Sequence, residues 1–179
     1  MAEYLDIVDA KGCPTGQIVE RTVAHAQGLW HRTSHVWLLR RHEGRLQVLL
    51  QLRSLTKDSF PGCYDISSAG HIPAGVGFVE SALRELEEEL GVKAFPSQLI
   101  HCGDRKIICD DIFHGQEYHD RQYSRVFCLW LNREAEDFVL QTEELQGVIW
   151  MDFSQCCAKV AAKAIPHCID LEELELLHK

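Results

Sequence analysis

The order of apolar and polar residues predicts a β-hairpin over residues 36–52. Two apolar runs, 36–39 and 46–52, stand on either side of Glu43-Gly44, a pair suited to a tight turn. In the second run every other residue from Leu46 onward is aliphatic. This alternation predicts a strand with one face in a core.

Further along the chain the same kind of pattern predicts strands alternating with helices. Residues 64–67, 126–131 and 148–151 are predicted strands, and 126–131 is apolar on both faces, which is typical of a buried central strand. Residues 70–77 contain three glycines and a proline and are predicted to be irregular. Residues 154–178 are predicted to be largely helical. Strands interleaved with helices indicate an α/β layered domain.

A helix is predicted from about Phe78 to Leu90, ending at Gly91, a residue that commonly terminates helices. At about 100° per residue its aliphatic side chains fall on one stripe. The stripe consists of Val79, Leu83, Leu86 and Leu90. We expect this stripe to pack on the sheet.

Three glutamates of this helix are spaced to hold a divalent cation. Glu85, Glu88 and Glu89 converge on a face away from the apolar stripe, whereas Glu87 points into water. Like charges within one turn destabilise a helix, as do anions near its C-terminal end. A bound cation reverses both effects, and carboxylate oxygens are ligands that Mg²⁺ and Mn²⁺ prefer. A solvated acidic helix face is the alternative interpretation.

Composition and charge exclude several classes of protein. The 179 residues suffice for one domain, and 46% apolar with 25% charged residues is a globular balance. Lys and Arg total 18 against 27 Asp and Glu, so the net charge of −9 gives no general attraction to nucleic acid or an anionic membrane. No apolar run approaches the ~18 residues of a membrane span, and the N-terminus lacks a secretion signal. We therefore expect a cytoplasmic protein whose eight cysteines are reduced thiols, most of them in the core.

Residues 70–92 resemble the Nudix box, G-x5-E-x7-R-E-U-x-E-E-x-G-U, in which U is aliphatic. Eight of the nine specified positions match: Gly70, Arg84, Glu85, Leu86, Glu88, Glu89, Gly91 and Val92. The exception is Val76, which stands where the family has its first glutamate. The resemblance implies a single Nudix domain over residues 1–179, with an α/β Nudix fold in which a mixed β-sheet is sandwiched between α-helices. The C-terminal helical segment would span about 154–178.

In Nudix enzymes the box holds divalent cations against a diphosphate, so the resemblance implies a hydrolase that uses Mg²⁺ or Mn²⁺. Such cations neutralise charge on the phosphate oxygens and lower the pKa of an attacking water. Glu85 and Glu89 would be the principal ligands, with Glu88 as a further ligand or a general base. Arg84 would orient the carboxylates, and the backbone carbonyl of Ala69 would complete the metal shell.

The resemblance extends over about residues 4–152 and includes features of isopentenyl-diphosphate isomerases. Counted back from Pro61-Gly62, Arg53 and Lys57 match the arginine and lysine that bind the substrate diphosphate in those enzymes. Arginine offers a bidentate fork and lysine a point charge, so the pair suits a diphosphate. Two ordinary surface cations are the alternative interpretation.

Three histidines resemble a metal site of the same isomerases. His25, His31 and His71 lie near the positions of the metal-binding histidines, although His25 and His31 are one residue closer together than in the isomerases. His35 has no counterpart among them. The resemblance therefore implies a second metal site, with ordinary loop and hairpin histidines as the alternative.

The residues that isomerisation requires are missing. The position of the proton-exchanging cysteine is Ala69, and that of the later glutamate is Gln122, beside Asp120. Neither alanine nor glutamine can exchange a proton with an alkene carbon. We therefore expect hydrolysis on an isomerase-like scaffold, with isomerisation as one alternative. The other alternative, favoured by Val76, is a catalytically weakened domain that senses a diphosphate ligand.

Two further groups are candidates for substrate contact. Glu117 and Asp120 lie in a polar stretch between strands, where Nudix enzymes often place substrate contacts and an extra acid or base. Core packing is expected for at least three of the four tryptophans, although any of them could stack on a nucleobase. They are Trp30, Trp37, Trp130 and Trp150. The predicted partner is a small-molecule diphosphate, without nucleic acid or membrane, while the organic group of the substrate and a homodimer stay undecided.

Overall fold

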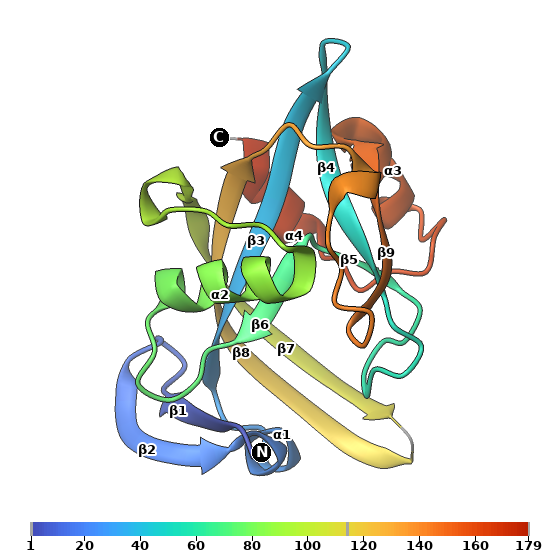
Figure 1. Ribbon diagram of the computed structural model, residues 1–179. Helices are drawn as coiled ribbons and strands as arrows, with labels where there is room; N and C mark the ends of the chain where they lie inside the picture. Colours follow the sequence, from blue (N-terminus) through green and yellow to red (C-terminus); the bar gives the residue numbers. More distant parts are fainter. Residues whose placement is uncertain (1, 114, 179) are drawn as a thin grey trace.

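The computed structural model describes residues 2–113 and 115–178, in which nine strands form a mixed sheet accompanied by four α-helices (Figure 1). The strands are β1 (Tyr4–Val8), β2 (Pro14–Glu20), β3 (His31–His42), β4 (Arg45–Arg53), β5 (Tyr64–Asp65), β6 (Ser68–His71), β7 (Ile100–Phe113), β8 (Gln116–Trp130) and β9 (Leu145–Asp152). The helices are α1 (Arg21–Gln27), α2 (Phe78–Leu90), α3 (Phe153–Ala161) and α4 (Leu171–Glu175).

The long strand β3 lies at the centre of the sheet. β8 pairs with it in parallel, with His31 opposite Gln122. β6 pairs antiparallel with the first half of β3, where Thr33 lies opposite His71, and β4 pairs antiparallel with the second half of β3. β7 continues the sheet beyond β8 as a long antiparallel hairpin. Successive side chains along β3 point to opposite faces of the sheet.

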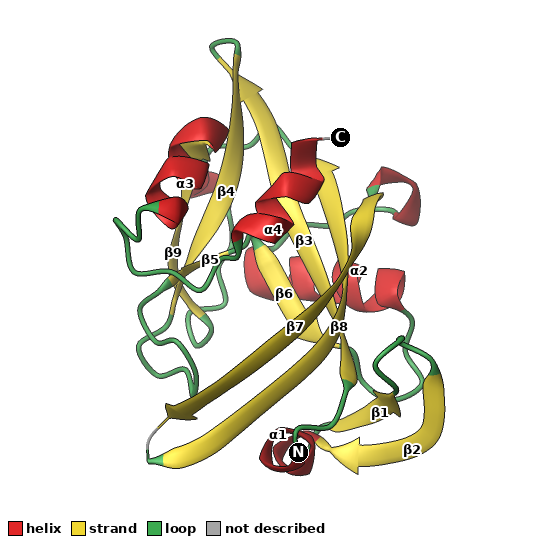
Figure 2. Cartoon of the chain, turned by 180° about the vertical axis from the view of Figure 1, so that it is seen from behind, coloured by secondary structure: helices red, strands yellow, loops and turns green. Residues whose placement is uncertain are grey.

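Helices cover both faces of this sheet (Figures 1 and 2). α2 packs on one face, where Leu86 joins Val36 and Leu38 in a buried cluster. α3 and α4 cover the other face, where Leu174 belongs to the same buried cluster as Trp37. The expected fold, a mixed β-sheet sandwiched between α-helices, is confirmed.

Two local predictions are confirmed. β3 and β4 form a hairpin whose turn residues, Glu43 and Gly44, have φ values of 49° and 77°. Positive φ at both positions is the geometry of the two-residue turns that suit twisted strands. The predicted helix is α2, Phe78–Leu90, and it ends at Gly91, whose φ is 63°.

The apolar stripe of α2 differs in part from the predicted one. Leu86 and Leu90 are fully buried, as expected, but Val79 and Leu83 are only half-buried. Ala82 is fully buried instead. Because Ala82 carries only a methyl group, the first turns of the helix approach the strands closely and the larger side chains lie at the margin of the contact.

Several element boundaries were predicted incorrectly. Of the predicted strand 64–67 only the first two residues are in a strand, β5, and residues 66 and 67 connect it to β6. The segment 70–77, predicted to be irregular, contributes its first two residues to β6. Residues 154–178 form most of α3, an irregular connection and α4. α3 ends at Ala161, shortly before Lys163, whose φ of 49° is not helical, and Pro166 further along the connection cannot donate a helical hydrogen bond. The sequence prediction missed β1, β2 and β7. Most residues of β2 and β7 are not buried, so no alternation of apolar residues marks them.

The cysteines are all free thiols, as expected, but most lie outside the core. Cys128 and Cys156 are buried, whereas Cys13 is exposed and the others are half-buried. Cys109 and Cys168 line the cleft described below. Within the described ranges no helix combines the length and the apolar character needed to span a membrane.

Candidate active site

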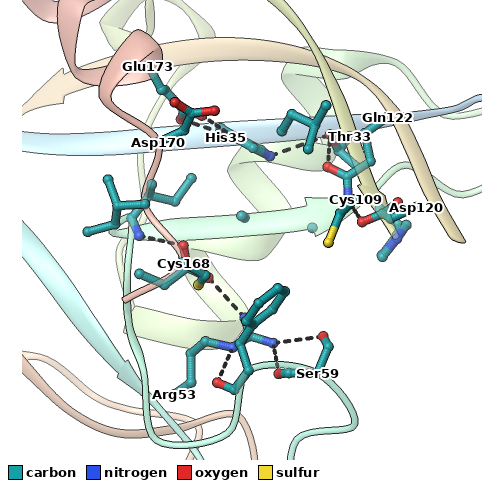
Figure 3. A pocket seen from close by; sticks show the side chains of 18 of the residues that line it. Thr33, His35, Arg53, Ser59, Cys109, Asp120, Gln122, Cys168, Asp170 and Glu173 are labelled. Atoms are coloured by element: carbon teal, nitrogen blue, oxygen red, sulfur yellow. Dashed lines mark hydrogen bonds and ion pairs between the residues drawn. The ribbon is translucent and has the colours of Figure 1, made fainter. Parts of the chain in front are cut away.

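A cleft of about 840 Å³ lies between α2, the β7–β8 hairpin and the C-terminal segment 160–173 (Figure 3). Its floor is one face of the sheet, where Thr33 of β3, His71 of β6 and Gln122 of β8 lie. Most residues predicted to bind a metal ion or the diphosphate line this cleft. They are Arg53, Lys57, Ala69, His71, Arg84, Glu85, Glu88 and Glu89.

The three box glutamates lie in three different environments. The carboxylate of Glu85 packs over Gly70, where a Cβ atom would overlap it, and it is bonded to Arg84. Glu89 is only 6% exposed and accepts a hydrogen bond of 2.7 Å from Ser68 Oγ. Glu88 is exposed to solvent. The expectation that Glu89 faces away from the core is therefore wrong, because α2 packs directly against β6.

Burial governs the ionisation of Glu85 and Glu89. Desolvation raises the pKa of Glu89 to about 8, opposed by the hydrogen bond from Ser68 and reinforced by the charge of Glu85. Desolvation also raises the pKa of Glu85, although the hydrogen bond and charge of Arg84 oppose the shift. Two buried carboxylates with raised pKa values are stabilised as anions when a divalent cation lies between them.

The loop before α2 is held in place without the first box glutamate. The backbone carbonyl of Val76 accepts a hydrogen bond of 3.0 Å from Arg32 Nη2. The carboxylate of Asp6 accepts hydrogen bonds from the same Arg32 nitrogen at 2.7 Å and from the Gly75 N–H at 2.8 Å. A carboxylate from β1 thus anchors this loop.

Arg53 and Lys57 line the cleft, and both are engaged by protein groups. Arg53 Nη1 donates to Asp65 at 3.0 Å, while its Nη2 and Nε donate to the carbonyls of Ser59 and Phe60 at 2.9 and 3.2 Å. Lys57 forms an ion pair with Glu144. Arg53 therefore fixes the loop that follows β4 as well as placing positive charge at the cleft.

The three predicted histidines come together with Asp120. His25 of α1, His31 of β3, His71 of β6 and Asp120 of β8 each offer a ligand atom, and these atoms all lie within 4.8 Å of one another. His31 Nε2 is 3.4 Å from Asp120 Oδ1, and the His25 and His71 Nε2 atoms are 3.3 Å apart. Asp120 was expected as a substrate contact or an extra acid or base, not as a metal ligand.

This histidine cluster fits a metal ion. His31 Nε2 and Asp120 Oδ1 are buried without a hydrogen-bond partner, and His31 Nδ1 donates to the Leu29 carbonyl, which leaves Nε2 as the ligand atom. Desolvation lowers the pKa of His25 to about 3 and of His31 to about 4, so their lone pairs are free. Three imidazoles and one carboxylate suit Zn²⁺ or Mn²⁺ better than Mg²⁺.

Other predicted residues lie away from the cleft. Glu117 is exposed and pairs with His119 at 3.6 Å. Among the described residues that line the cleft there is no tryptophan: Trp37 is fully buried and Trp130 is 47% exposed.

The sequence reasoning missed His35, Arg105 and Glu173, which line the cleft as one hydrogen-bonded network. His35 and Glu173 are 138 positions apart in the chain, so no local pattern connects them.

A mixed sheet between helices, with the glutamates of the Nudix box lining a cleft, agrees with the fold and the site that the sequence resemblance implied. The chain belongs to the NUDIX domain family, whose sequence profile matches residues 29–168. Members of this family hydrolyse pyrophosphate bonds and generally depend on divalent metals.

Relatives and solved structures agree with this assignment. The chain is 34% identical over 153 residues to an uncharacterized Nudix hydrolase of Clostridium acetobutylicum, covering 86% of this chain and 71% of that protein. Its fold is similar to that of DR0079 from Deinococcus radiodurans, with a TM-score of 0.72, 19% identity and coverage of 99% and 100%. The NUDIX domain of NrtR from Shewanella oneidensis, in complex with ADP-ribose, gives a TM-score of 0.59 at 17% identity, covering 82% and 85%.

Proposed function

We propose that this Nudix hydrolase cleaves the diphosphate linkage of a nucleoside-diphosphate-type or other small organic diphosphate, with Mg²⁺ or Mn²⁺ held by the box glutamates. The observation that carries the proposal is the placement of Glu85 and Glu89 in the same cleft as Arg53 and Lys57. Burial disfavours the charged form of both carboxylates, a bound cation would favour it, and the cation together with the positive side chains would neutralise a diphosphate. ADP-ribose bound to the NUDIX domain of NrtR supports a ligand of this class.

Each box residue has a distinct role in the proposed reaction. Glu85, oriented by Arg84, and Glu89 hold the cation, and the Ala69 carbonyl completes the shell. When bound, the cation neutralises charge on the diphosphate and lowers the pKa of the attacking water. Glu88 is exposed at the cleft, so it can accept the proton of that water and release it to solvent.

Arg53 and Lys57 bind the diphosphate in this proposal. The ion pair between Lys57 and Glu144 is partly exposed, so it contributes little to stability and yields to the higher charge of a diphosphate. Arg53 keeps its bonds to the loop after β4 and so presents its charge in a fixed place.

We further propose that His25, His31, His71 and Asp120 form a second metal site. The isopentenyl-diphosphate isomerase resemblance implied a metal site at the three histidines, and their ligand atoms lie close together. This placement supports an isomerase-like scaffold. The cluster lies beside the cleft, which His71 and Asp120 line. A cation held by these residues would add positive charge beside the cleft.

Isomerisation of isopentenyl diphosphate is the alternative that the histidine cluster favours. Ala69 and Gln122 oppose it, because neither side chain exchanges protons. Gln122 Nε2 instead donates a hydrogen bond of 2.6 Å to Asp120, a bond that orients the carboxylate of the cluster.

A panel assay tests the proposed function. Product release is measured from nucleoside diphosphates, ADP-ribose and isopentenyl diphosphate, with Mg²⁺, with Mn²⁺ and with neither, and isomer formation is measured alongside. Metal-dependent cleavage of one or more compounds is the expected result. Isomer formation without cleavage would establish the isomerase, whereas binding without any reaction would establish a sensor, and the variant Val76→Glu would then be assayed for gained turnover.

A further inference from the structure

The loop that leads into α2 lies against β1, a strand outside residues 29–168, the part of the chain that the NUDIX profile matches (Figure 1). Residues 72–77 of this loop connect β6, the strand of Ala69, to α2, the helix of the box glutamates. The conformation of the loop therefore sets the position of the glutamates relative to β6. The proposed hydrolysis so far makes no use of β1.

Backbone contacts hold the first part of this loop on β1. Pro73 forms a β-bridge with Leu5, and the Ala74 N–H donates a hydrogen bond of 2.8 Å to the Tyr4 carbonyl. The chain then turns, with a hydrogen bond of 3.1 Å from the Val76 N–H to the Pro73 carbonyl. The loop thus follows β1 up to a tight turn that leads into α2.

Two charged side chains, Asp6 and Arg32, hold the turn itself. Asp6 Oδ2 accepts hydrogen bonds from the Gly75 N–H at 2.8 Å and from Arg32 Nη2 at 2.7 Å. The same arginine nitrogen donates to the Val76 carbonyl at 3.0 Å, and the guanidinium lies 5.5 Å from the ring centre of Phe78, the first residue of α2. The side chains of Asp6 and Arg32 are only 27% and 15% exposed, so these charge-assisted bonds are partly shielded from water. One carboxylate thus connects β1 to the turn and to the start of α2.

Asp6 supplies a carboxylate close to the place where the box lacks one. Val76 stands at the position of the first box glutamate, and its aliphatic side chain offers no hydrogen-bond acceptor. Among the described residues, Asp6 is the one carboxylate within ion-pair distance of Arg32. Loss of Asp6 would leave a mostly buried positive charge without its counter-charge and would free the Gly75 N–H.

We propose that Asp6 is a positioning residue for the hydrolysis: its carboxylate holds the loop 72–77 and so fixes α2 against β6, in place of the glutamate that the box lacks. The inference rests on the proposed function and adds to it a residue from β1. Asp6 itself does not line the cleft, so it acts through Arg32 and the loop. The valine of the box is then compatible with full turnover, and the sensor alternative loses the feature that favoured it.

Two aspartates of the same hairpin provide a matched test. Asp6→Ala removes both bonds to the turn, whereas Asp9→Ala removes bonds of 2.7 and 2.9 Å from backbone N–H groups of the turn between β1 and β2. Asp6→Ala should lower kcat roughly 10- to 100-fold, the effect of displacing groups behind a site, with KM nearly unchanged because Arg53 and Lys57 still bind the diphosphate. Asp9→Ala should keep the wild-type values. An unchanged kcat in Asp6→Ala, or an equal loss in both variants, would overturn the inference.

A carboxylate introduced at residue 76 distinguishes positioning from a general loss of stability. Because Arg32 already contacts the backbone of Val76, a glutamate there would lie within reach of the same guanidinium. The double variant Asp6→Ala with Val76→Glu should recover most of the lost kcat, and Val76→Glu alone should leave kcat near the wild-type value. No recovery in the double variant would contradict the inference, as would a gain from Val76→Glu alone that equals the loss in Asp6→Ala.

Two measurements that need no turnover separate failure of this inference from failure of the proposed function. Hydrogen exchange of the Gly75 N–H is measured without metal, and binding of Mg²⁺ or Mn²⁺ at the box is followed by the amide resonances of Glu85 and Glu89. If wild type hydrolyses no compound of the panel, Asp6→Ala should still speed the exchange about 10-fold or more, the value of a hydrogen bond to a charged group, and weaken metal binding roughly 10- to 100-fold. Unchanged exchange or unchanged metal binding would overturn the inference alone, and a wild type that binds no metal at the box would overturn both.

A second variant replaces Asp6→Ala in every comparison if that protein does not fold. Asp6→Asn keeps an acceptor oxygen for the Gly75 N–H but removes the counter-charge of Arg32. It should lower kcat in the same direction, and Val76→Glu should restore it. A kcat equal to that of wild type would overturn the inference.

Discussion

The carboxyl group of Glu89 lies in a site that water scarcely reaches. Its ordinary pKa of 4.5 is raised by burial to about 8, so the folded, metal-free protein retains this proton more strongly than the unfolded chain does. As the pH rises above 4.5, Glu89 ionises in the unfolded chain but not in the folded protein, so the folded state becomes less stable relative to the unfolded chain. This loss of stability is complete above about pH 8. A bound cation would remove this penalty.

We predict that metal-free Glu89→Gln matches wild type in stability below pH 4.5 and becomes the more stable protein as the pH rises to about 8. The amide keeps an acceptor for Ser68 but has no charge to bury. Urea unfolding between pH 4 and 9 measures the difference. Equal stability at all pH values would show that Glu89 ionises as freely as an exposed glutamate.

The same variant should lose turnover by about 100-fold or more, the scale on which preorganised electrostatic groups contribute to catalysis. The control is Glu87→Gln on the same helix, where the glutamate is exposed and pairs with Lys93 at 3.2 Å. Glu87→Gln should retain wild-type turnover. Full activity of Glu89→Gln would remove it from the proposed metal site.

His31 occupies the centre of the histidine cluster and is fully buried. We predict that His31→Ala weakens binding of Zn²⁺ or Mn²⁺ more than about 100-fold, since even residues behind a metal ligand contribute 10- to 100-fold. Titration calorimetry with each metal measures the affinity. His42→Ala, an exposed position at the other end of β3, is the matched control and should bind as wild type does. Unchanged binding in His31→Ala would show that the ion binds elsewhere.

At the scale of elements, the close approach of β6 to α2 sets the position of Glu85. Gly70 permits this approach, because a Cβ atom there would overlap the Glu85 side chain. We predict that Gly70→Ala costs about 1–3 kcal/mol of stability, as overpacking does, and lowers turnover by displacing the carboxylate. Thermal unfolding and the product-release assay measure the two effects.

A second glycine of the same sheet provides the control for this prediction. A Cβ atom added at Gly147 of β9 would meet no described atom within 4 Å, so Gly147→Ala should leave turnover unchanged. The double substitution Gly70→Ala with Glu85→Ala should recover stability without recovering turnover. If Gly70→Ala alone were as active as wild type, the prediction would be contradicted, because the overlap would then be relieved without displacing the Glu85 carboxylate.

At the scale of the whole molecule, Glu173 connects the C-terminal helix to the central strand. Burial opposes its charge, but His35 and Arg105 outweigh burial and lower the pKa of Glu173 to about 2. A lowered pKa gives stability that is fully present above the ordinary value of 4.5 and is lost as the pH falls towards about 2. The ionised Glu173 therefore stabilises this end of the cleft most strongly above pH 4.5.

We predict that Glu173→Gln destabilises the protein by about 3–5 kcal/mol at pH 6, because its buried cationic partners lose their counter-charge. The difference from wild type should shrink as the pH falls below 4.5. Urea unfolding at pH 6, 4.5 and 3.5 measures it. Glu175→Gln, an exposed position on the same helix, is the control. A constant difference across these pH values would mean that the carboxylate charge is not what stabilises the network.

Sequence patterns were enough to predict the elements whose causes are local. The hairpin at Glu43-Gly44 follows from turn chemistry, and the end of α2 at Gly91 from the left-handed backbone that glycine tolerates. The spacing within the Nudix box likewise identified the glutamates of the cleft. Each of these features depends on residues a few positions apart.

Tertiary packing determines which side chains lose contact with water and which distant ones meet. Helical periodicity placed Glu89 on a polar face, but the packing of α2 against β6 buried it. Asp120 joined three histidines, and His35 met Glu173, because β3 pairs with β6 and β8 while α4 folds back over its far end. Such contacts depend on strand pairing and on burial, which bring together residues that no local pattern relates.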